Sequence, residues 1–122
     1  MTRAAVLLVV VAACSKAGPS GPTSREALMA AWKQAGLNPA GFVVTNSPIG
    51  KDCQLGTVNQ LDVMVCSFAT PDEAKAAQPA GLKWVGDTTG AAQAHGAILI
   101  AVADRKKSDP TGKTINQVLK AH

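Results

Sequence analysis

Two of the chain's three cysteines, Cys53 and Cys66, flank a sequence that predicts a β-hairpin. Residues 52–58 and 61–68 have strand composition, and Asn59-Gln60 between them is interpreted as a two-residue turn. Such a turn places Cys53 opposite Cys66, at a non-hydrogen-bonded pair whose Cα atoms lie about 4.5 Å apart. That distance is within reach of a disulfide. We therefore predict a structural Cys53–Cys66 bond, with two buried free thiols as the alternative.

A second candidate for chemistry is the polar loop Gly86-Asp87-Thr88-Thr89-Gly90, which lies between two apolar segments and is followed by His95. Loops on a rigid scaffold often carry function, so these residues are a candidate ligand loop. Turn chemistry alone is the competing explanation, because Gly adopts positive φ while Asp and Thr bond to nearby backbone groups.

Other catalytic and cofactor patterns are incomplete. The two histidines, His95 and His122, have no Cys or carboxylate neighbours at ligand spacing, so no metal site is expected. No serine stands in a Gly-x-Ser-x-Gly motif. Gly112-Lys113-Thr114 resembles the end of a phosphate-binding loop, but Lys107 stands where that motif needs its first glycine. We expect no cofactor and no enzymatic activity; the alternative is a small envelope enzyme that uses His95 and Asp87.

The first fourteen residues have the pattern of a secretory signal. Arg3 precedes an apolar run over residues 4–11, too short for a membrane-spanning helix of about 20 residues. Val11-Ala12-Ala13-Cys14 then resembles the lipobox of bacterial lipoproteins. The resemblance implies that residues 1–13 are a cleaved signal peptide and that Cys14 is lipidated. Cleavage by an ordinary signal peptidase, leaving a free Cys14 thiol, and cytoplasmic retention with the run as a buried strand are the alternatives.

Residues 14–23 are interpreted as a lipid-anchored flexible linker, because they are small, polar and rich in Gly and Pro. A linker of ten residues places the domain roughly 17 Å from its anchor on average. Ser15 stands where lipoproteins of the inner membrane often carry Asp, so the resemblance favours the outer membrane, facing the periplasm. Export to such an oxidising compartment lets the Cys53–Cys66 disulfide form.

Residues 24–122 have the length of a single domain, and capping and turn signals divide them. Helices are predicted over 24–35 with Thr23 as cap, from Thr70 to before Pro79, and after Asp109-Pro110. Strands are predicted over 42–45, 52–58, 61–68, 82–85 and 97–103. The last of these is continuously apolar, which indicates burial on both faces or beneath a helix.

This order, α-β-β-β-α-β-β-α, predicts an α+β domain with a small, mostly antiparallel sheet and helices packed on one face. A ferredoxin-like arrangement is the leading candidate.

Composition limits the classes of function. The chain is 47% hydrophobic and 16% charged, which is typical of a globular protein. Its net charge is +4, but only Arg105-Lys106-Lys107 cluster and aromatics are 3%, which argues against nucleic-acid binding. That cluster is interpreted either as a solvated turn or as a group of cations attracted to an anionic membrane surface. We expect a binding or interaction module whose partners are the membrane, through its anchor, and an unknown envelope protein or ligand.

Overall fold

The computed structural model describes residues 24–120. The predicted signal peptide and linker, with Cys14 and His122, lie outside the described residues, and what was expected of them stays a prediction. Within residues 24–120, no helix is long and apolar enough to cross a membrane.

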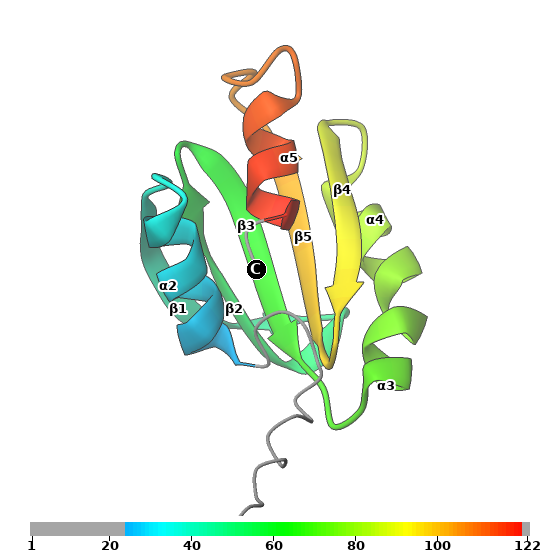
Figure 1. Ribbon diagram of the computed structural model, residues 1–122. Coiled ribbons are helices and arrows are strands. Elements are labelled where there is room, and N and C mark those ends of the chain that lie inside the picture. The colour runs from blue at the N-terminus through cyan, green and yellow to red at the C-terminus, as the bar shows by residue number, and fades with distance from the viewer. Residues whose placement is uncertain (1–23, 121–122) are drawn as a thin grey trace, which may run out of the picture.

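In this part of the chain, five strands form one antiparallel sheet in the order β1-β2-β3-β5-β4 (Figure 1). The strands are β1 (Pro39–Ser47), β2 (Gly50–Val58), β3 (Leu61–Ser67), β4 (Thr89–His95) and β5 (Ile98–Asp104). The α+β class and the antiparallel sheet are thus confirmed. A ferredoxin-like domain follows the order β-α-β-β-α-β, whereas here the first three strands follow one another with no helix between them.

The helices cover both faces of the sheet, which corrects the expectation that they cover one. α2 (Arg25–Gln34) and α5 (Lys113–Lys120) pack on one face, and α3 (Pro71–Ala76) and α4 (Gln78–Val85) pack on the other (Figure 1). Successive strand residues point to opposite faces, and β5 is buried at every position. Ile98, Ile100 and Val102 therefore pack beneath α2 and α5, while Leu99 and Ala101 pack beneath α3 and α4.

The β2–β3 hairpin has the predicted register. Asn59 and Gln60 both have positive φ, 52° and 79°, as a two-residue type I′ turn requires. Val58 pairs with Leu61, Leu55 with Met64, and Cys53 with Cys66. The alternation of side chains between the two sheet faces and the turn that joins the strands are local properties, which is why the sequence is sufficient to predict them.

The predicted strand over residues 82–85 is wrong, because these residues form the second half of α4. Pro79 lies in the first turn of α4, a position where proline favours a helix, and the helix buries Gly81 and Val85. The missing strand is β4, which after Thr89 contains only Gly, Ala, Gln and His and so carries little β propensity. Its small side chains let α4 approach closely: a Cβ on Gly81 would lie 2.8 Å from the Cβ of Ala92.

The helix caps follow the sequence in part. The Thr70 hydroxyl accepts a hydrogen bond from the Glu73 N–H at 3.2 Å, and Glu73 in turn accepts one from the Ala69 N–H at 3.1 Å. α3 is therefore capped as predicted. The cap of α2 is Ser24, which accepts from the Ala27 N–H at 3.2 Å, so the prediction of Thr23 was one residue early.

The two ends of the sheet differ. We call the first the entry end: the described chain begins there, and Arg25 contacts Asp52 and Ser67. We call the opposite one the loop end, because it carries the 59–60 turn, the 86–88 loop and the 105–112 segment (Figure 1). The strand pairs Val58↔Leu61 and Thr89↔Asp104 place these three segments at the same end.

Candidate functional site

The predicted ligand loop, residues 86–90, lies at the loop end and connects α4 to β4. Its shape follows from turn chemistry: Gly86 ends α4 with a φ of 66°, and the Thr88 hydroxyl donates to the Val85 carbonyl at 2.8 Å. Gly90 is already in β4, where it lies against the backbone of Val102. Asp87 is exposed, so its carboxylate is accessible from solvent.

This loop forms one wall of a cavity of about 360 Å³, which we call the loop pocket. Asp87, Thr88 and Thr89 line that wall, and the segment from Asp104 to Pro110 lines the other. Only the residues of the first wall were identified from the sequence as a candidate site. The second wall comes from the end of β5, and no local pattern joins the two, because antiparallel pairing of β4 with β5 brings them together.

Two buried aspartates give the second wall its shape. Asp104 accepts hydrogen bonds from the backbone N–H groups of Ser108 and Asp109, both at 2.9 Å, and from the Ser108 hydroxyl at 3.2 Å. Asp109 accepts one from the Ile115 N–H at 2.8 Å and so holds the first turn of α5. Burial raises the pKa of Asp104, but the donors from Asp109 and Ser108 outweigh it and hold the pKa below its ordinary value. The two buried carboxylates therefore stabilise the conformation of the 105–112 segment and the start of α5 by accepting hydrogen bonds from backbone N–H groups.

Arg105 joins the loop pocket to its surroundings. Its guanidinium forms an ion pair with Asp62 at 3.3 Å and donates to the Trp84 carbonyl at 2.9 Å. It also lies 4.8 Å from the centroid of the Trp84 ring, a cation–π distance. Of the predicted basic cluster, Arg105 is therefore tied to the protein, whereas Lys106 and Lys107 are exposed and make no ion pair with described residues.

His95 is not part of this pocket. It ends β4 and pairs with Ile98, whereas Asp87 precedes the start of that strand. Six residue steps along β4 correspond to about 20 Å. The structure therefore does not bring His95 and Asp87 together, and a shared acid–base site built from them has no geometric basis here.

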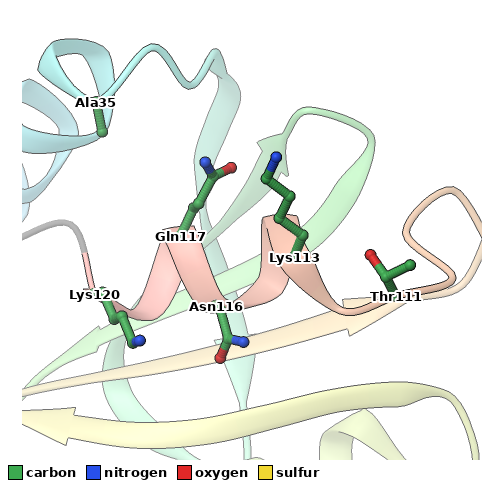
Figure 2. A pocket seen from close by; sticks show the side chains of 6 residues that line it. All are labelled: Ala35, Thr111, Lys113, Asn116, Gln117 and Lys120. Atoms are coloured by element: carbon green, nitrogen blue, oxygen red, sulfur yellow. The ribbon is translucent and has the colours of Figure 1, made fainter.

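A second hollow, the α2–α5 groove, has a volume of about 560 Å³. Figure 2 shows that α5 supplies most of its lining, with Ala35, the residue that caps the C-terminal end of α2, on the other side. The side chains from α5 are Lys113, Asn116, Gln117 and Lys120. Sequence reasoning singled out Lys113 only within a failed phosphate-loop pattern. The spacing i, i+3, i+4, i+7 was the available signal, since it places all four residues on one helix face.

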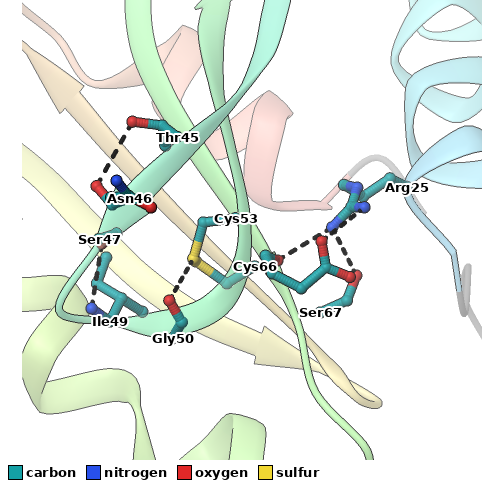
Figure 3. The surroundings of a disulfide bond; sticks show 10 residues. Arg25, Thr45, Asn46, Ser47, Ile49, Gly50, Cys53, Cys66 and Ser67 are labelled. Carbon is teal, nitrogen blue, oxygen red and sulfur yellow. Dashed lines mark hydrogen bonds and ion pairs between the residues drawn. A yellow bond between two sulfur atoms is a disulfide. The ribbon is translucent and has the colours of Figure 1, made fainter.

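The predicted disulfide is present: Cys53 and Cys66 are bonded, with their Cα atoms 4.0 Å apart and both residues fully buried (Figure 3). Arg25 holds the adjacent pair, Asp52 and Ser67. It forms an ion pair with the Asp52 carboxylate at 3.0 Å and donates to the Ser67 hydroxyl at 3.0 Å. Cys53 Sγ lies 3.6 Å from the Gly50 carbonyl, a contact without a hydrogen bond because a disulfide sulfur carries no hydrogen.

Within residues 24–120, no group of three or more His, Cys, Asp or Glu side chains could hold a metal ion. No family model, no curated protein and no solved structure matches the chain.

Proposed function

We propose that this chain is a bacterial envelope lipoprotein, anchored through Cys14 in the outer membrane and facing the periplasm, whose α+β domain is a binding or interaction module. The observation that carries the proposal is the Cys53–Cys66 disulfide. Structural disulfides persist in oxidising compartments such as the periplasm, so the bond supports export. Pairing of these two cysteines leaves Cys14 as the third cysteine, at the position that the lipobox pattern requires.

The binding role is supported by the positions of the entry end and the loop end, which lie at opposite ends of the sheet. The described chain begins at the entry end, where Arg25 contacts the base of the β2–β3 hairpin, so a linker before residue 24 would join the domain there. The loop pocket lies at the opposite end. A ligand or partner could therefore reach Asp87, Thr88 and Lys107 without displacing the anchor.

The alternative, an envelope enzyme that uses His95 and Asp87, gains no support from the geometry. The two residues lie at opposite ends of β4, and only Asp87 lines the loop pocket. The binding module is therefore the function that the geometry supports better.

Anchoring is tested by metabolic labelling. The chain, expressed in a bacterium, should incorporate labelled palmitate and partition into detergent, and Cys14→Ala should abolish both. The matched control is the double variant Cys53→Ala with Cys66→Ala, which should remain labelled. A soluble, unlabelled wild-type protein in the periplasmic fraction would refute the proposal.

Binding at the loop pocket is tested by site-specific photo-crosslinking in the same cells. A photoreactive amino acid at Asp87 or Lys107 should give discrete adducts, whereas the same amino acid at the exposed Lys51, near the entry end, should not. Equal adducts at all three positions, or adducts at Lys51 alone, would assign binding to another surface.

A further inference from the structure

The outward face of α5 is a cationic surface with no carboxylate opposite it. Ile115, Val118 and Leu119 of this helix are buried, which turns Lys113, Asn116, Gln117 and Lys120 outward (Figure 2). All four are exposed, and none is acidic. Another hollow, at the start of α5, has Lys106 and Thr114 in its lining, which also contains no acidic residue. We call Lys106, Lys113 and Lys120 the α5 lysine face.

None of the acidic groups of the described residues forms an ion pair with these lysines. The eight Asp and Glu residues of the chain all lie in the described part. Asp52 and Asp62 form ion pairs with arginine, and Asp104 and Asp109 are buried and accept backbone hydrogen bonds. Glu26, Asp72 and Glu73 lie in the first turns of α2 and α3, and Asp87 is exposed in the 86–88 loop. The α5 lysine face therefore has no ion pair with any described residue.

Lys113 is the first residue of α5, and the first turn of this helix contains no acidic residue. The N-terminal end of a helix carries a partial positive charge, which the buried Asp109 carboxylate offsets by accepting a hydrogen bond from the Ile115 N–H at 2.8 Å. An anionic surface against this face would therefore act on the lysine side chains themselves, those of Lys106, Lys113 and Lys120.

We infer that the α5 lysine face docks on the anionic lipid headgroups of the bilayer that holds the anchor. This inference rests on the proposed function, because it is the lipid that keeps the domain near the membrane. α5 packs on the same face of the sheet as α2, the helix with which the described chain begins, so both sit on one side of the domain. A linker of ten residues, spanning roughly 17 Å, is long enough for the domain to lie with this side against the headgroups.

The test is lysine footprinting on the lipidated protein in proteoliposomes. Acylation rates are read by mass spectrometry in phosphatidylcholine vesicles and in vesicles with about one third phosphatidylglycerol. Lys106, Lys113 and Lys120 should react about fivefold more slowly in the anionic vesicles, the factor expected for a lysine at such a surface. About 0.5 M NaCl should abolish the difference, because salt screens exposed charges. Lys75 and Lys83, on the helices of the opposite sheet face, should react equally in both.

Matched variants separate the effect of the α5 lysine face from the effect of the protein's net charge. Lys113→Gln with Lys120→Gln should remove the protection of Lys106, whereas Lys75→Gln with Lys83→Gln, an equal change of charge, should preserve it. Equal rates in both vesicles on palmitate-labelled protein would overturn the inference and leave the proposed function intact. If the chain carries no palmitate, the proposed function fails, and the same footprint with added vesicles still decides whether this face binds anionic lipid.

Discussion

Trp32 on the first described helix donates a hydrogen bond from its indole Nε1–H to the carbonyl of Val118 on the last helix, at 2.9 Å. The two residues are 86 positions apart, and both are fully buried. The bond ties α2 to α5 over one face of the sheet, and Phe42 of β1 stacks on the same indole with ring centroids 5.9 Å apart.

Trp32→Phe should lower the free energy of unfolding by about 2–3 kcal/mol, because it leaves the buried Val118 carbonyl without this donor. Urea denaturation followed by circular dichroism measures the loss. Trp84→Phe is the control: Trp84 is half-buried and contacts Arg105 by cation–π, so its loss should be about 1 kcal/mol or less. Equal losses in both variants would show that the hydrogen bond contributes little.

Replacing the disulfide by Cys53→Ala with Cys66→Ala should lower the free energy of unfolding by about 2–3 kcal/mol, since the bond constrains a loop of the unfolded chain. Unreduced wild-type protein should weigh two hydrogens less than the reduced chain. Reductant should lower the melting temperature of the wild type and leave the alanine variant unchanged. Two thiols that alkylate freely in native periplasmic protein would contradict the structure.

Acid should destabilise the domain through Asp104. Its folded-state pKa lies below the ordinary value of 3.8, so the unfolded state binds more protons in this range. The stabilisation is complete above that ordinary value and is lost as pH falls through the folded-state pKa. Urea midpoints at neutral pH and below about pH 4 should therefore diverge for the wild type and much less for Asp104→Asn. The exposed Asp87→Asn is the control and should retain the wild-type dependence.

Gly90→Ala should be strongly destabilising, by about 3 kcal/mol, because a Cβ there would overlap the Val102 carbonyl and crowd Val85. Gly96→Ala is the matched control in the turn after β4. Nothing lies within 4 Å of a Cβ at Gly96, and only its φ of 58° disfavours alanine, at about 1 kcal/mol. Thermal melts of the two variants should therefore differ by several degrees, and a Gly90→Ala protein as stable as Gly96→Ala would contradict the packing.

The features that were predictable from the sequence alone depend on residues close together in the chain. The turn at Asn59-Gln60 and the strands beside it set the hairpin register, and that register placed Cys53 opposite Cys66. The hydroxyl of Thr70 and the carboxylate of Glu73 marked the start of α3 in the same way. In each case the contacts join residues a few positions apart in the chain, or they follow from the two-residue period of side chains along a strand.

The other features of the fold and of the loop pocket depend on contacts between residues that are distant in the chain. Residues 82–85 are a short segment that is apolar except for Lys83, so their pattern suits a strand or part of a helix. Packing against the small residues of β4 selects the helix. Asp104 and Thr89 are partners because β4 and β5 pair, and that pairing forms the loop pocket while carrying His95 to the far end of the strand. Contacts between distant residues also decide that helices cover both faces of the sheet. Burial of β5 on two sides requires two helical layers, and which helix joins which layer depends on contacts such as Trp32 with Val118, between residues distant in the chain.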